Sequence, residues 1–140
     1  LFPVLTSAFF AAVLLVGLGA RKAVELEFSC FERIARTLRE QARPDEPVVN
    51  YRCFTRSLPF YLQRRVRLID YDKIDHRFDA GTEEYRAQVR FGREALRELL
   101  ESAPRVWVVT KAKYVEADSE LSARTREVDR NGSLVLRVTR

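Results

Sequence analysis

Residues 48–70 read VVNYRCFTRSLPFYLQRRVRLID, and this stretch decides the fold. Val48–Tyr51 is a short apolar run typical of a buried strand, and Val66–Tyr71 is a second one. Between them, Leu58–Arg65 is expected to form a brief helix with Pro59 in its first turn, where a missing N–H costs nothing. Two buried strands joined by a helix indicate a parallel pair, because parallel strands need a crossover connection.

The rest of the chain continues this alternation. Thr82 is expected to cap a helix that runs through Leu100 with a kink at Gly92. Val106–Thr110, with the sequence VWVVT, is the most strand-like run, and the Asn131-Gly132 pair predicts a hairpin turn. The remaining predicted segments are a loop, a weak helix and the two hairpin strands: Asp72–Gly81, Lys113–Ala123, Glu127–Asp129 and Leu134–Val138. The pattern predicts an α/β fold, a small Rossmann-like α/β/α sandwich with a C-terminal β-hairpin and without the dinucleotide fingerprint.

The first twenty residues, Leu1–Ala20, carry no charged side chain, and eleven of them are Leu, Phe or Val. At about 1.5 Å per residue they span about 30 Å, the thickness of a hydrocarbon core. A signal peptide would need a basic start, and a buried core helix would show a polar face. We therefore expect three parts: a last transmembrane helix at 1–20, an amphipathic connecting helix at 21–46 and a soluble α/β domain at 47–140. Since the chain has no methionine, we expect it to be the C-terminal piece of a longer protein.

The composition limits the chemical classes of partner that the chain is expected to bind. A net charge of +5 and a pI near 9.6 allow an anionic partner, but the arginines are scattered among acids and no nucleic-acid-binding motif is present. Beside a membrane, such a surface favours lipid headgroups or lipid-linked phosphates. Cys30 and Cys53 are expected to be free and buried, with a disulfide as the alternative. His76 is the only histidine and is expected to be solvated, so the sequence predicts no metal site, no cofactor and no catalytic residue.

The candidate binding residues follow the first predicted strand at its carboxyl end, where parallel sheets place their crevices. Tyr51, Arg52, Arg56 and Tyr61 are the four candidates, because rings stack on sugars and guanidinium groups bind phosphate. The alternative is that Phe60 and Leu62 belong to the core, that the tyrosines are half-buried and that the arginines form a solvated edge.

The order of these motifs resembles the C-terminal end of bacterial membrane glycosyltransferases, the relatives of aminoarabinose transferase and of protein O-mannosyltransferases. The matching segments are Tyr51-Arg52 at a strand end, SLPFYL at Ser57–Leu62, the basic pair Arg64-Arg65 and the strand VRLID at Val66–Asp70. The VWVV strand after a long helix also fits. After Asp70 the sequence YDKIDHRFDAG departs from the turn that many relatives have there.

The resemblance implies an integral membrane enzyme that moves a sugar from a polyprenyl-phosphate donor to a lipid, as in lipid A modification, or to another acceptor. It implies a soluble domain on the periplasmic face of the bacterial inner membrane. It places the catalytic carboxylate in a loop outside this chain, so the fragment would be accessory, with Arg52 and Arg56 as candidates to stabilise the departing phosphate.

Two alternatives stay open. One is a membrane-tethered binding or interaction domain without transferase activity. The other is a cytoplasmic domain that docks on anionic lipids through its basic helix. The second is favoured by the positive-inside rule, because five basic residues follow the expected span: Arg21, Lys22, Arg33, Arg36 and Arg39.

Overall fold

The computed structural model describes residues 31–55, 57–71, 82–83 and 88–140. The chain divides into two compact units, Leu1–Cys30 and Phe31–Arg140, and all the described residues belong to the second. The transmembrane helix predicted at 1–20 and the loop predicted at Asp72–Gly81 lie outside the described residues. Within those ranges, no helix has the length and apolar character needed to cross a membrane.

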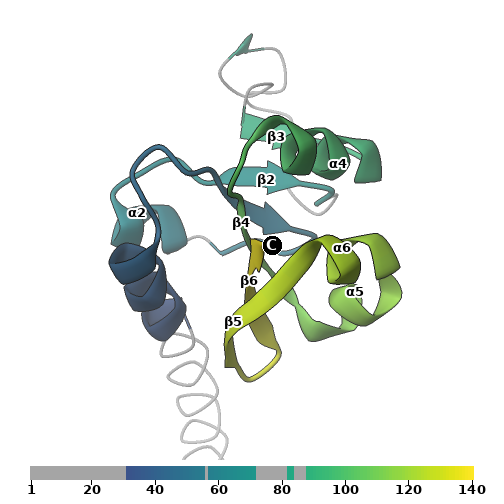
Figure 1. The fold of residues 1–140 in the computed structure, drawn as a ribbon. Helices are drawn as coiled ribbons and strands as arrows, with labels where there is room; N and C mark the ends of the chain where they lie inside the picture. The colour runs from purple at the N-terminus through teal and green to yellow at the C-terminus, as the bar shows by residue number, and fades with distance from the viewer. Residues whose placement is uncertain (1–30, 56, 72–81, 84–87) are drawn as a thin grey trace, which may run out of the picture. The chain divides into compact units, whose positions relative to one another are not determined.

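A six-stranded sheet forms the centre of the described unit (Figure 1). Its strands lie in the order β3-β2-β1-β4-β6-β5. The pairs β3·β2, β2·β1 and β1·β4 are parallel, whereas β6 is antiparallel to both β4 and β5. The strand bounds are Val48–Tyr51 (β1), Arg67–Ile69 (β2), Val89–Arg90 (β3), Trp107–Lys111 (β4), Thr125–Asn131 (β5) and Leu134–Thr139 (β6).

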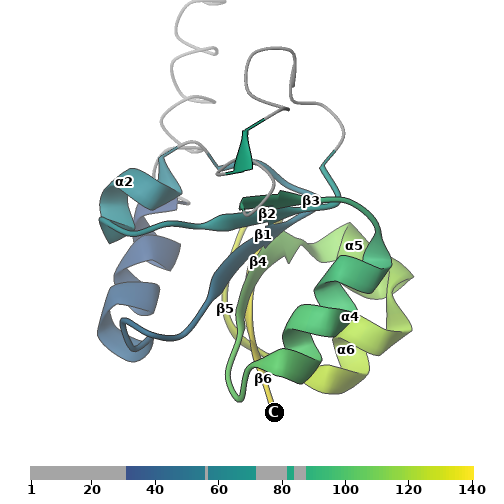
Figure 2. The same cartoon turned by 90° about the horizontal axis from the view of Figure 1, so that it is seen from above.

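Helices cover both faces of this sheet (Figure 2). The helix over residues 31–41 and α2 (Leu58–Leu62) pack on one face. The helices α4 (Arg93–Ser102), α5 (Ala112–Ala117) and α6 (Ser119–Arg124) pack on the other. The predicted α/β class, the parallel strands and the two covered faces are confirmed; the Rossmann-like description stays a prediction.

The strand β4 explains why the sheet is covered on both sides. Its side chains alternate between two cores: Trp107 and Val109 face the first helical layer, while Val108 faces the second together with the preceding Val106. All four are fully buried. A strand that is apolar on both faces is stable only between two layers, because each such side chain contributes about 1.5–3 kcal/mol when it leaves water.

The helix predicted from Thr82 through Leu100 is wrong at its centre. Val89–Arg90 is a short strand, β3, that pairs in parallel with β2, and a new helix begins at Arg93. The break lies at Gly92, whose φ of 83° and ψ of 158° place it in extended left-handed space that only glycine adopts easily. Gly92 therefore ends a strand connection and does not kink a continuous helix.

The predicted hairpin is confirmed. β5 and β6 pair in antiparallel register, with Asn131 opposite Leu134 and Gly132 at a φ of 60° in the turn. The weak helix predicted over Lys113–Ala123 is two short helices, separated at Asp118. Asp118 breaks the helix because its side chain accepts a hydrogen bond from the Leu121 N–H and so caps α6.

Candidate functional site

The residues that follow β1, β2 and β4 meet at the carboxyl edge of the sheet. Tyr51 pairs with Ile69 across β1 and β2, so the next residues, Arg52 and Asp70, are neighbours. The Nε of Arg52 lies 3.0 Å from a carboxylate oxygen of Asp70. In parallel sheets, ligands bind at this edge where connections on the two sides of a strand diverge. β1 meets that condition, because β2 lies on one side of it and β4 on the other.

The backbone is strained at this edge. Arg52 and Asp70 have φ values of 52° and 55°, a left-handed conformation that costs a non-glycine residue about 1–3 kcal/mol. Hydrogen bonds hold it in place: the Arg52 N–H donates to the Ile69 carbonyl at 2.9 Å, and the Gly92 N–H donates to the Asp70 carboxylate at 3.3 Å. Such strain clusters at functional sites, and here it turns both side chains toward each other.

An aromatic ring and a second cation complete the candidate site. The guanidinium of Arg52 lies 5.0 Å from the ring centre of Tyr114, and the ammonium of Lys113 lies 4.9 Å from the same ring. Both partners come from α5, directly after β4. The Arg52 side chain is 44% exposed, and among the described residues only its Nε has a polar partner. Its two terminal amino groups can therefore bind an anion beside a ring that can stack on a sugar.

Further aromatic side chains flank this edge. Phe54, just after β1, stacks on Tyr71, just after β2, with ring centres 5.8 Å apart. Phe54 and Phe91 are both exposed. The edge thus presents cations and apolar rings together, which suits a ligand that has a charged group and a nonpolar or sugar part.

Tyr51 lies beneath the edge, where its side chain is only 2% exposed. Its hydroxyl donates to the Asp118 carboxylate at 3.1 Å, and burial, followed by the charge of Asp118, raises the pKa of Tyr51 to about 12. Burial alone would raise the pKa of Asp118, but hydrogen bonds from the Leu121 N–H, Arg93 and Tyr51 outweigh it and lower that pKa. A ligand at the edge would contact Arg52. Tyr51 lies below it and, through Asp118, connects β1 to the start of α6.

Cys53 is a free, buried cysteine, as the sequence predicts. Its Sγ donates to the Val109 carbonyl at 3.2 Å, and burial raises the pKa of the thiol to about 12. It is therefore a core side chain and not a nucleophile. Within the ranges described above, no group of three or more His, Cys, Asp or Glu side chains is placed to hold a metal ion.

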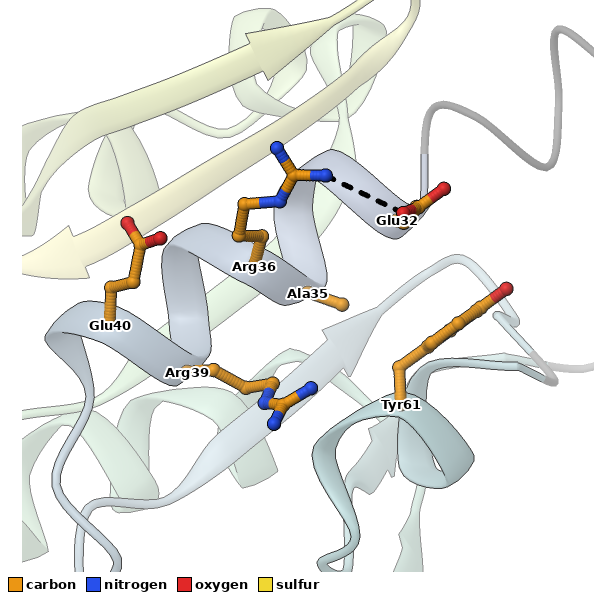
Figure 3. Close-up of a pocket in the computed structure, with 6 residues that line it drawn as sticks. All are labelled: Glu32, Ala35, Arg36, Arg39, Glu40 and Tyr61. Carbon is orange, nitrogen blue, oxygen red and sulfur yellow. Dashed lines mark hydrogen bonds and ion pairs between the residues drawn. The ribbon is translucent and has the colours of Figure 1, made fainter.

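The other two predicted binding residues do not join Arg52 in this site. Arg56 lies outside the described residues. Tyr61 lies on α2 and lines a separate pocket of about 520 Å³ between α2 and the helix over residues 31–41 (Figure 3). Its binding role, like those of Tyr51, Arg52 and Arg56, stays a prediction.

Sequence reasoning missed Asp70 as the partner of Arg52 and missed Lys113 and Tyr114 altogether. The strand VWVVT was recognised, and the residues after it occupy the same edge as the residues after β1. Applying the carboxyl-end rule to both strands would have found Lys113 and Tyr114, since neighbouring parallel strands end at one edge.

The comparison with known families identifies the chain. The described unit is a small α/β domain with cationic and aromatic side chains at the carboxyl edge of its sheet. The family of aminoarabinose transferase C-terminal domains matches residues 34–135. The chain belongs to this family. No curated protein matches it closely enough to add to this assignment.

Two solved structures share the fold. One is ArnT from Cupriavidus metallidurans bound to undecaprenyl phosphate, with a TM-score of 0.63 and 18% sequence identity, covering 79% of this chain and 20% of that one. The other is the same protein in the apo state, with a TM-score of 0.60 and 16% identity, covering 76% of this chain and 19% of that one. The chain thus spans about one fifth of the length of these structures.

Proposed function

We propose that the chain is the C-terminal part of an integral membrane glycosyltransferase that moves a sugar from a polyprenyl-phosphate donor to a lipid or another acceptor. Membership of the aminoarabinose transferase C-terminal domain family supports this, as does the fold shared with an ArnT that binds undecaprenyl phosphate. Because the chain matches only 20% of that structure, the groups that perform the transfer would lie in the rest of a longer protein. The described unit would be accessory to them.

The single observation that carries a role for this unit is the exposed Arg52 guanidinium at the carboxyl edge. Asp70 fixes the Nε side of the group at 3.0 Å, which orients the terminal N–H groups, and none of the described residues takes them as a polar partner. Bidentate guanidinium–phosphate pairs are among the strongest hydrogen-bonded contacts in proteins. Lys113 adds a second positive charge beside Tyr114. We propose that this edge holds the phosphate of the donor and stabilises the charge that develops when the sugar leaves.

Transfer kinetics of the longer protein test this role. Arg52→Gln keeps a polar side chain but removes the charged donors, which are worth about 1.5–3 kcal/mol, or about 10–100-fold, in a phosphate contact. We expect kcat/KM for the donor to fall by that factor. The matched control is Arg126→Gln, since Arg126 is exposed on β5 and has no ion-pair partner among the described residues. Equal kinetics for the two variants would remove Arg52 from the donor site.

A second experiment separates the transferase from a tethered binding domain. The 140-residue chain alone should not transfer sugar, whereas the longer protein should. If the longer protein also fails with every polyprenyl-linked donor tested, the tethered binding domain is the better account.

The proposed location is the periplasmic face of the bacterial inner membrane. A reporter fused after Arg140 tests it: an enzyme active only in the periplasm should be active there. Activity of a reporter that works only in the cytoplasm would contradict this placement.

A further inference from the structure

The net positive charge of the chain lies in one segment. Residues 51–69 contain five arginines and no acidic residue, and the net charge of the whole chain is also +5, so the remaining residues are balanced. This segment leaves β1, forms α2 and returns as β2, and α2 covers one face of the sheet. The segment that contains α2 therefore carries an excess of arginines in the sequence.

The same segment exposes a large apolar side chain on α2. Phe60 on α2 is 81% exposed, which corrects the alternative prediction that it belongs to the core. α2 has only five residues and buries just Leu58. Phe60 instead packs against the ring of Tyr61 edge to face, with ring centres 6.1 Å apart. An exposed phenylalanine beside a half-buried tyrosine and basic side chains is typical of a surface that meets the interfacial layer of a membrane.

A pocket opens next to this aromatic pair. Tyr61 lines it from α2, and Glu32, Ala35, Arg36, Arg39 and Glu40 line it from the helix over residues 31–41. Arg36 is paired with Glu32 at 3.5 Å. Arg39 has no ion-pair partner among the described residues, and Figure 3 shows it pointing into the gap toward α2, while Glu40 points to the opposite side of its helix. The pocket therefore presents a guanidinium that has no ion-pair partner among the described residues, and Tyr61 lines the same pocket.

We infer that this face, defined by Arg39, Phe60 and Tyr61, docks on the surface of an anionic lipid bilayer. Phe60 enters the interfacial layer, where aromatic side chains are favoured, and Arg39 contacts a lipid phosphate at the mouth of the pocket. A bilayer fits both the cationic and the aromatic part of this surface, because its negative headgroups and its apolar layer lie within a few ångströms of each other. The sequence supplies a reason for the contact, because the uncharged segment Leu1–Ala20 begins the same chain. The inference does not depend on the transfer reaction.

Tryptophan quenching by brominated lipids tests the docking in the full 140-residue chain. The chain is reconstituted into vesicles of equal parts phosphatidylglycerol and phosphatidylcholine, with brominated or ordinary acyl chains. Phe60→Trp places the probe on the proposed face, and Ala123→Trp places a control on α6, which covers the opposite face of the sheet. Trp107 is fully buried and gives the same background in both variants. We expect brominated lipid to quench Phe60→Trp and shift its emission to the blue, and to leave Ala123→Trp unchanged.

Charge dependence completes the test. Vesicles of phosphatidylcholine alone should lower the quenching of Phe60→Trp. In the mixed vesicles, adding Arg39→Gln to Phe60→Trp should lower the ratio of docked to undocked protein about fivefold, as expected for the loss of one basic residue near an anionic surface. Arg126→Gln should leave this ratio unchanged. Equal quenching of the two tryptophans, or quenching that ignores both lipid charge and Arg39, would overturn the inference. Inorganic phosphate without vesicles is the last control. If it changes the emission of Phe60→Trp, and Arg39→Gln removes that change, the inference is overturned in favour of a site for free phosphate.

Discussion

Replacing Asp118 by alanine should destabilise the layer beneath the carboxyl edge. Three donors converge on this carboxylate: the Tyr51 hydroxyl at 3.1 Å, the Leu121 N–H at 3.1 Å and the Arg93 guanidinium. The carboxylate is itself buried. Asp118→Ala removes one acceptor from three partners that sit on β1, α4 and α6, so its effect is not confined to one helix.

The magnitude follows from what each partner loses. The α6 cap is worth about 1 kcal/mol. The Tyr51 hydroxyl is buried and would be left without an acceptor, at a cost of about 1–3 kcal/mol. Arg93 is half-exposed and can turn to water, so its ion pair adds about 0–1 kcal/mol. Since these contributions share one residue and are not additive, we expect the free energy of unfolding to fall by about 2–4 kcal/mol.

Urea denaturation of the chain in detergent, followed by the fluorescence of the buried Trp107, measures this loss. Asp118→Asn is the matched control, because asparagine caps helices as well as aspartate does, and it should cost about 1 kcal/mol. Tyr51→Phe should destabilise the wild-type chain by about 1–2 kcal/mol. In the Asp118→Ala background the same change should be nearly neutral, because the Tyr51 hydroxyl has already lost its acceptor. A loss below about 1 kcal/mol for Asp118→Ala, or strict additivity of the two changes, would refute this reasoning.

Three further predictions concern the buried side chains of Glu46 and Cys53 and the backbone of Gly92. Glu46→Ala should lower the free energy of unfolding by about 2–3 kcal/mol, because the buried Trp107 Nε1 donates to Glu46 at 2.7 Å and would lose its acceptor, while Glu46→Gln should cost less than about 1 kcal/mol. Burial alone would raise the pKa of Glu46, but the Trp107 hydrogen bond and others outweigh it and lower that pKa from 4.5, so this stabilisation is present above pH 4.5 and is lost as the pH falls below it. A urea titration repeated across that range should show wild type approaching the alanine variant in acid; a constant gap would contradict the assignment. Gly92→Ala should cost about 1–3 kcal/mol in the same assay for its φ of 83° alone, since no atom lies within 4 Å of an added Cβ, and a neutral result would mean that the turn relaxes freely. Cys53 should resist maleimide in the native chain and react in denaturant, as read by peptide mass mapping, because its thiol is buried; native labelling would argue against that burial.

Two of the strands that the sequence revealed have side chains buried on both faces. Val48–Tyr51 and Val106–Thr110 are mostly apolar runs in which every residue is buried, because each face of such a strand meets a helical layer. Val89–Arg90 could not be found in this way. It has two residues, lies at the edge of the sheet and is only partly buried, so it leaves no periodic pattern, and the apolar spacing of the helix after Gly92 obscured it.

Only the part of the candidate site that follows β1 could be predicted from the sequence. Arg52 stood out because it follows an apolar run, but its contacts with Asp70 and Tyr114 depend on which strands are neighbours and in what register. That information is absent from local spacing. Phe60 shows the opposite failure: composition favours burial of a phenylalanine, yet a five-residue helix has room to bury only one side, and Leu58 occupies it.

The claim that the carboxyl edge serves a polyprenyl-linked donor is tested most directly by equilibrium binding. A fluorescent polyprenyl phosphate is titrated into the longer membrane protein carrying this domain, with wild-type Arg52, with Arg52→Gln and with Arg126→Gln. We expect the Kd to rise about 10–100-fold for Arg52→Gln and to stay at the wild-type value for Arg126→Gln. An unchanged Kd for Arg52→Gln would contradict the assignment of this edge to the donor phosphate.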